Sequence, residues 1–264
     1  MIKKHNAGFS LMEIAIVVVL ISLLAGGFTV GQSMIRASQM RNAMGDVAKY
    51  TQAFNNFLAQ YKSPPGDLLT AQNYWGIDPA GCTNPQSSTA AAHTTTCNGN
   101  GDGHIGSGSI TPGGAQDYEV FRAWQQLSAS GYLNGSTTSV FTGISGTGST
   151  LGAIIGKNVP AASIPGGGWT IMFQNVAAAG DGDHYGYLLH HVLFLGSVAT
   201  NSFTYGPLLT PAEALSIDGK LDDGLPGSGT VQAIKSQSNC STNSTTYKTS
   251  YTGAACGLMF VTNF

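Results

Sequence analysis

Charged residues are scarce in this sequence: they make up 9% of its 264 residues, whereas an ordinary soluble domain has roughly 25%. The formal net charge is −2, so the chain lacks the overall basic field that would concentrate phosphates, and no nucleic-acid partner is indicated. Gly, Ser, Thr and Asn are abundant after residue 62 instead. We therefore expect a neutral head that is rich in loops and hydroxyl groups.

The sequence also lacks familiar signatures of catalysis. It contains no G-x-S-x-G turn, no H-E-x-x-H helix and no G-x-x-x-x-G-K-[ST] phosphate loop. His190 and His191 are adjacent, so in a strand they point to opposite faces, and only one of them would join His184 in a metal site. We predict that the chain is not an enzyme; an enzyme or receptor on a membrane anchor is an alternative.

The amino-terminal region has the composition of a membrane anchor. Residues 1–8 form a short basic segment, and the stretch from Ile14 to Ile35 contains no charged side chain. About 20 such residues suffice to span a bilayer as a helix. Because Lys3 and Lys4 precede this segment, we expect a cytoplasmic amino terminus and an outward head after Arg36, in an oxidising compartment.

The motif G-F-S-L-M-E places a carboxylate, Glu13, inside the hydrophobic segment. A charge deep in a membrane helix costs roughly 2.5–3.5 kcal/mol on insertion scales, so it calls for a partner. Cleavage between Gly8 and Phe9 would remove the lysines and create a positive α-amino group four residues before Glu13. The pattern therefore indicates a processed amino terminus.

With this motif the sequence resembles the type IV prepilins and type II secretion pseudopilins over residues 1 to about 35. The resemblance implies that a prepilin peptidase cuts after Gly8 and that the new terminal Phe9 is methylated. It implies that Glu13 pairs with the Phe9 amine of a neighbouring subunit, identical or related, and sets the axial register of a filament.

The same resemblance predicts a structural subunit of a type IV pilus, with a pseudopilin of a type II secretion system as the alternative. It implies a single-pass protein of the bacterial inner membrane, surrounded by lipid and delivered by an assembly platform. The final location would be a cell-surface pilus or a periplasmic pseudopilus.

Apolar or small residues recur at steps of three and four from residue 37 to residue 61, which predicts one face of a continuous helix. We assign 1–8 to a leader and 9–61 to this helix, with 9–35 in the membrane or filament core and 36–61 as an amphipathic stem. The helix should stop near Lys62, because prolines follow. The residues expected to face the head are Met40, Met44, Val47, Phe54 and Leu58.

The head, residues 62–264, is predicted to be α+β and pilin-like, with large irregular loops. A short helix is expected after Glu119, with Gly131 as its stop, and Thr210, Pro211 and Glu213 predict a capped helix start. The β-prone runs are 169–176, 184–195 and 257–261. They suffice for an antiparallel sheet on which the stem can pack.

The four cysteines form two couples, and the members of each couple are close in sequence. Neither couple is a C-x-x-C, so the sequence gives little support to a metal-binding or redox role. A Cys82–Cys97 disulfide would hold a loop that lacks a core of its own, at a gain of around 3 kcal/mol. Cys240 and Cys256 bracket a Ser/Thr/Asn segment. By the family resemblance, this couple looks like the carboxy-terminal disulfide loop of type IV pilins.

The run N-G-N-G-D-G-H-I at 98–105 has oxygen-bearing side chains at alternate positions, as calcium loops do. The predicted ligands are Asn98, Asn100 and Asp102 by side chain, the carbonyl of His104, and Asp117 or Glu119 to complete the shell. Because carboxylates are few, we expect an affinity of about 0.1–1 mM. A Gly-rich turn that binds nothing is the alternative. The calcium-like loop slightly favours a pseudopilin.

A second acidic segment, D-G-K-L-D-D-G, begins at Asp218. Asp218, Asp222 and Asp223 would form a second cation site, but acidic residues before glycine are more often solvated turn formers. We favour the turn here and keep the cation site as the alternative.

Overall fold

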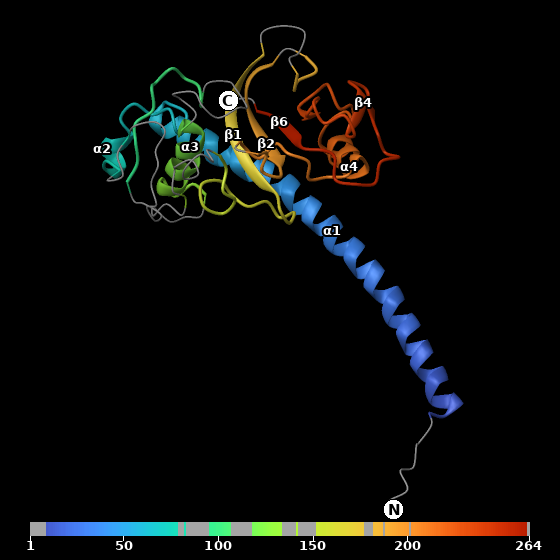
Figure 1. Ribbon diagram of the computed structural model, residues 1–264. Coiled ribbons are helices and arrows are strands. Elements are labelled where there is room, and N and C mark those ends of the chain that lie inside the picture. Colours follow the sequence, from blue (N-terminus) through green and yellow to red (C-terminus); the bar gives the residue numbers. More distant parts are fainter. Residues whose placement is uncertain are drawn as a thin grey trace, which may run out of the picture.

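The computed structural model describes residues 9–78, 82, 95–106, 118–133, 141, 152–176, 182–186, 188–200 and 202–262. Its helices are α1 (Leu11–Tyr61), α2 (Ala71–Trp75), α3 (Tyr118–Ala129) and α4 (Pro211–Leu221). Its strands are β1 (Gly168–Val176), β2 (Leu188–Gly196), β3 (Val231–Ala233), β4 (Ser241–Asn243), β5 (Thr246–Tyr247) and β6 (Leu258–Val261). One long helix thus leads into a head of strands and shorter helices (Figure 1).

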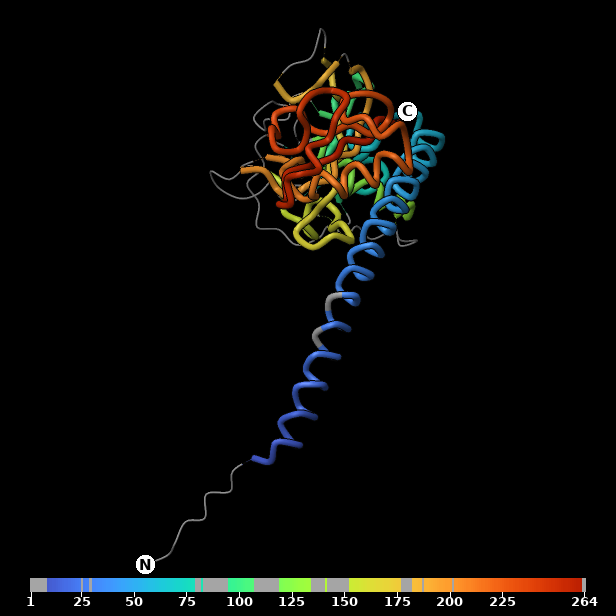
Figure 2. The backbone as a smooth tube through the Cα atoms, turned by 90° about the vertical axis from the view of Figure 1, so that its right-hand side faces the viewer, coloured from blue at the N-terminus to red at the C-terminus, as the bar shows by residue number. Residues whose placement is uncertain are grey.

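Helix α1 extends far beyond the head, and only its second half lies against it (Figures 1 and 2). Its 51 residues correspond to about 77 Å at 1.5 Å per residue. Lys62 ends it in the left-handed conformation at φ 57°, where its N–H bonds to the Leu58 carbonyl. Pro64 and Pro65 follow. The predicted stop near Lys62 is confirmed.

The larger sheet has the strand order β1-β2-β6-β3, and every neighbouring pair is antiparallel. Strands β1 and β2 pair over their full length, from Gly168 opposite Gly196 to Val176 opposite Leu188. The three predicted β-prone runs supply β1, β2 and β6. Most of their residues are buried at consecutive positions, so both faces of the sheet are covered. Their apolar side chains belong to the core, and the predicted α+β fold is confirmed.

The stem packs on the sheet through aromatic side chains. The Tyr50 ring lies 5.0 Å from that of Trp124 in α3 and 5.6 Å from that of Trp169 in β1, both edge-on. Phe54 is fully buried and lies 5.6 Å from the His191 ring of β2. Helix α1 is therefore held between α3 and the sheet.

The predicted stem face is displaced by about one residue. Phe54 is buried as expected, but Met40, Met44, Val47 and Leu58 are only partly buried. The fully buried face is made by Ala43, Tyr50, Ala53, Phe54 and Phe57. Large aromatic rings bury more apolar area than methionines, and small alanines let the helix approach the sheet closely, so these residues determine the helix rotation.

The other head helices follow local sequence signals. Helix α4 has the predicted capping box: the Thr210 hydroxyl accepts from the Glu213 N–H at 3.3 Å, and Glu213 accepts from the Thr210 N–H at 2.9 Å. Gly131 follows α3 with φ 82°, a conformation that favours glycine. Helix α2 and strands β3, β4 and β5 are too short to have produced a periodic pattern, and we had not predicted them.

Candidate assembly and cation sites

Glu13, predicted to be an acid within an apolar segment, lies in the first turn of α1. Ser10 is the N-cap residue, with extended backbone at φ −69° and ψ 143°. Its N–H donates to Glu13 Oε2 at 2.8 Å, and its hydroxyl accepts from the Met12 N–H at 3.2 Å. This is a capping box, S-x-x-E, and the sequence already contained its signal. Gly8, the predicted cleavage residue, lies outside the described residues.

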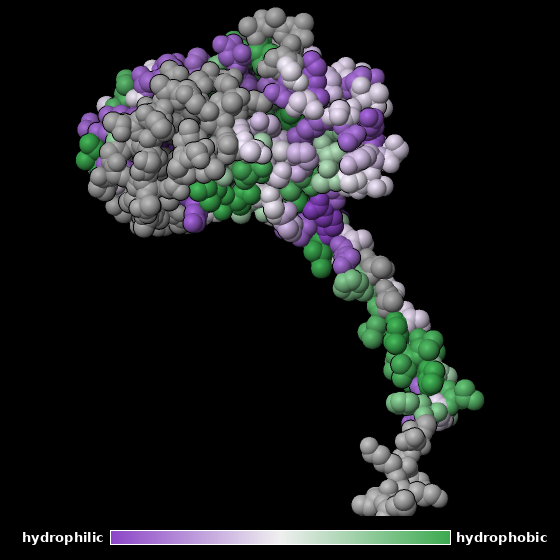
Figure 3. All heavy atoms as spheres, in the orientation of Figure 1, coloured by the Kyte–Doolittle hydropathy of each residue, from purple (hydrophilic) through white to green (hydrophobic). Residues whose placement is uncertain are grey.

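The apolar half of α1 is unpacked along its length. Leu23 is 69% exposed and Leu24 is 73% exposed, and hydrophobic side chains gather on the face of this part of the helix that Figure 3 shows. The helix is long and apolar enough to cross a membrane. An open groove of about 520 Å³ adjoins Glu13; its lining is Phe9, Glu13, Ile14, Ile16 and Val17. This arrangement suits a lipid or helix partner.

An ion pair lies where the apolar half of α1 meets the head. Arg36 donates from Nε to Glu213 Oε1 at 2.6 Å and from Nη2 to Oε2 at 2.9 Å. Burial alone would raise the pKa of Glu213, but hydrogen bonds from Arg36 and Thr210 outweigh it and lower that pKa. The pair connects the stem to the start of α4.

The predicted calcium loop is an ordered turn in which side-chain oxygens accept backbone N–H groups. Asn98 Oδ1 accepts from Gln72 in α2, Asn100 Oδ1 accepts from Asp102, and Asp102 Oδ1 accepts from His104, each at 2.9 Å. The His104 ring stacks on Phe173 with centroids 3.8 Å apart. The loop oxygens are thus already engaged within the turn, although each can still accept a second partner.

The buried carboxylates of Asp67 and Glu119 accept hydrogen bonds from the backbone of this loop. Asp67 accepts N–H groups of Gly101, Asp102 and Gly103, the last at 2.9 Å. Glu119 accepts N–H groups of Asn100 and Gly106 at 3.0 Å each. We had not predicted a role for Asp67, and its signal was the P-P-G-D turn at the end of the stem.

Burial raises the pKa of Glu119 to about 8, against the opposing effect of its two backbone hydrogen bonds; the nearby Asp67 and Asp102 raise it further. Burial likewise raises the pKa of Asp67. Asp117, the other predicted ligand, lies outside the described residues. The loop therefore gathers three acidic groups, two of them buried, where the prediction had two, Asp102 and either Asp117 or Glu119.

In the second acidic segment, oxygens of Asp218, Asp222 and Asp223 lie within 4.8 Å of one another. Among the described residues this is the group of three acids whose ligand atoms converge. Asp218 is fully buried, and burial raises its pKa to about 6 despite hydrogen bonds from Tyr247 and Gly224. The solvated turn that we favoured is wrong for Asp218, because this residue lies within α4 and is buried. Only Asp222 and Asp223 follow the end of the helix, and the convergence of the three carboxylates also suits a cation.

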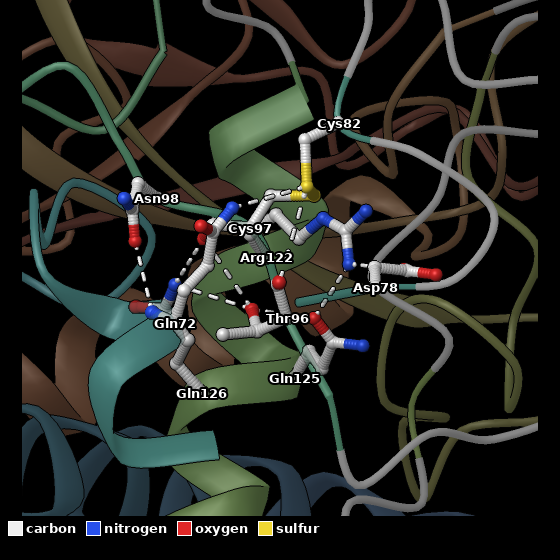
Figure 4. Close-up of a disulfide and its surroundings, with 9 residues drawn as sticks. All are labelled: Gln72, Asp78, Cys82, Thr96, Cys97, Asn98, Arg122, Gln125 and Gln126. Carbon is white, nitrogen blue, oxygen red and sulfur yellow. Dashed lines mark hydrogen bonds and ion pairs between the residues drawn. A yellow bond between two sulfur atoms is a disulfide. The ribbon is translucent and has the colours of Figure 1, made fainter. Parts of the chain in front are cut away.

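The two cysteine couples both lie at bonding distance, as Cys82–Cys97 and Cys240–Cys256. The first joins an exposed residue to a buried one beside α2, where Gln72 Nε2 lies 3.4 Å from Cys82 Sγ (Figure 4). The second ties the residue before β4 to a residue two positions before β6.

A buried ion pair lies beside the first disulfide (Figure 4). Arg122 Nη1 of α3 donates to Asp78 Oδ2 at 2.8 Å, and both side chains are fully buried. The same nitrogen donates to Gln125 Oε1, which also accepts from the Thr96 hydroxyl at 2.8 Å. Buried ions require such partners, so this network fixes the position of the segment around residue 96.

Comparison with known proteins gives one family match. The model described as the prokaryotic N-terminal methylation motif matches residues 3–29. Neither the curated proteins nor the solved structures contain a match. The motif covers Gly8, Phe9 and Glu13 and ends within the apolar half of α1.

Proposed function

We propose, from the premise that this chain is a type IV prepilin- or pseudopilin-like protein, that it is a structural subunit of a type IV pilus. The prepilin peptidase would cut after Gly8, methylation would follow at Phe9, and the subunit would polymerise through the apolar half of α1. In this role the chain is a building block and not an enzyme. Before assembly, the same helix would anchor it in the inner membrane.

One observation carries this proposal: the first half of α1 is exposed and apolar on all sides, and it bears a single acid, Glu13, near its start. Such a helix is stable only in lipid or among similar helices. Phe9 is 85% exposed and Leu11 is 90% exposed. Burying these side chains against neighbouring subunits would supply the driving force for polymerisation, since each contributes roughly 1.5–3 kcal/mol when fully buried.

Mass spectrometry of the membrane-extracted protein tests processing. We expect the mature chain to begin at Phe9 and to be heavier by one methyl group. A chain that keeps residues 1–8 would contradict both the pilin and the pseudopilin assignments, and would favour an anchored enzyme or receptor.

Electron microscopy after mild shearing separates a pilus from a pseudopilus. A pilin gives surface filaments that contain this chain. If such filaments are absent and deletion of the gene traps a secreted enzyme inside the cell, the chain is instead a pseudopilin. The predicted calcium loop gives this alternative its support.

We also propose that the head binds calcium. Two places support the idea: the oxygen spacing of 98–104, and the convergent carboxylates of Asp218, Asp222 and Asp223. The cation would reduce repulsion among acidic groups in either place. Weak binding is expected, because several of these oxygens already accept backbone hydrogen bonds.

Melting curves with and without millimolar calcium test this proposal, because a ligand that binds the folded state raises Tm. Asp102→Ala should remove the rise if the cation lies at 98–104, and Asp223→Asn should remove it if the cation lies after α4. If calcium leaves Tm of the parent unchanged, the head binds no calcium in this range.

A further inference from the structure

Ser10 and Glu13 are joined within one chain before any second subunit is present. The Ser10 N–H holds Glu13 Oε2 at 2.8 Å, and Oε1 accepts no hydrogen bond from the described part of the chain. One oxygen of the carboxylate is thus fixed on its own helix, whereas the other is available to a donor from elsewhere. A carboxylate fixed in this way has a defined direction.

We propose that Ser10 is a positioning residue for assembly: its cap presents Glu13 Oε1 to the α-amino group of an incoming subunit. This inference rests on the proposed function. An uncapped Glu13 has several rotamers, and only some would reach a neighbouring amine. Fixing one rotamer beforehand reduces the entropy lost when the subunit docks.

The same cap gives Glu13 a partner within its own chain. Glu13 lies in the first turn of α1, where the helix dipole and the free backbone N–H groups favour negative charge. Extended backbone at Ser10 takes Phe9 out of the helix. The acid is therefore satisfied within its own chain first and by the neighbour's amine later.

The test expresses each variant as a minority beside the parent chain and measures its share of sheared filaments by peptide mass spectrometry. Ser10→Ala removes the hydroxyl that fixes the cap, so its incorporation should fall about fivefold. Ser10→Thr keeps a capping hydroxyl and should stay within about twofold. Ser22→Ala is the matched control, because the Ser22 hydroxyl bonds within its own helix to the Val19 carbonyl at 2.8 Å.

A double variant separates positioning from a general effect on the helix start. If Ser10 acts through the charge of Glu13, adding Ser10→Ala to Glu13→Gln should cause no further loss of incorporation. A further fivefold loss in that background would show that Ser10 only stabilises the helix, and would overturn the inference.

Failure of the inference is distinguishable from failure of the proposed function. Normal incorporation of Ser10→Ala beside poor incorporation of Glu13→Gln overturns the positioning role and leaves the pilin assignment intact. A parent chain with an uncleaved terminus that enters no filament overturns the assignment itself.

Discussion

The two halves of α1 share one helix and differ in what surrounds them. In the first half, side chains such as Leu24 are 73% exposed, and apolar residues occur on every side. In the second half, Phe54 and Phe57 are fully buried against the head, and the opposite face is polar. Helix geometry is the same in both, so the distribution of apolar side chains alone assigns one half to lipid or helices and the other to the head.

Removing a large ring from the packed half should have the largest effect. Phe54→Ala should lower the free energy of unfolding of the head by about 3–5 kcal/mol, because it leaves a cavity beneath the sheet. Urea unfolding of the full chain in detergent micelles measures it. Leu24→Ala is the control in the unpacked half; a comparable loss of head stability there would break the comparison.

Enlarging a small residue at the contact should have a smaller effect. Ala43 is 1% exposed, so Ala43→Leu should overpack the contact between helix and head and cost about 1–3 kcal/mol. Ala48 lies on the same half but is exposed, and Ala48→Leu should leave the unfolding curve unchanged. Equal effects of the two substitutions would mean that α1 is not seated as described.

Cutting the ion pair at the junction should cost about 1 kcal/mol at pH 7, since both side chains are partly exposed. The pKa of Glu213 is lowered in the folded state, so its contribution is present above the unfolded value near 4.5 and is lost as pH falls through the folded value. Arg36→Gln should therefore destabilise the head at pH 7, and the loss should shrink as the pH falls through the folded value.

The exposed Arg41 is the site of the control substitution for this ion pair. Arg41→Gln should have no effect over the same range of pH. A pH-independent loss in Arg36→Gln would instead point to lost packing of the arginine stem.

Replacing a glycine in the packed half should have the smallest effect, and it should stabilise the head. A Cβ added at Gly45 would meet nothing within 4 Å. Gly45→Ala should therefore raise the free energy of unfolding by about 0.5–1 kcal/mol through helix propensity alone. A decrease, read from the same urea curves, would mean that another molecule or segment packs at this position.

Features that depend on local sequence were predictable. The end of α1 followed from Pro64 and Pro65, the start of α4 from Thr210 and Glu213, and strands β1, β2 and β6 from runs of β-prone residues. In each case the deciding interaction lies within a few residues of the signal. The family motif at Phe9 and Glu13 is equally local, and its match to the methylation motif agrees with the prediction.

Features that depend on distant segments were not predictable. The rotation of α1 is decided by Trp124 and Trp169, which are 74 and 119 positions after Tyr50 in sequence. Asp67 acquires its role only because the 98–106 turn folds over it. The periodicity of the stem showed that one face would be buried, but the spacing alone did not distinguish two neighbouring faces.

The position of β6 constrains when the head can form. This strand lies between β2 and β3, so β2 has only β1 beside it, and β3 has no neighbour in the sheet, until residues 258–261 have been made. Helix α1 ends at Tyr61, so it is synthesised before nearly all of the head. The sheet therefore stays open until almost the whole chain has been made, and a chain that stopped before residue 258 would have two exposed strand edges ready to pair with other chains.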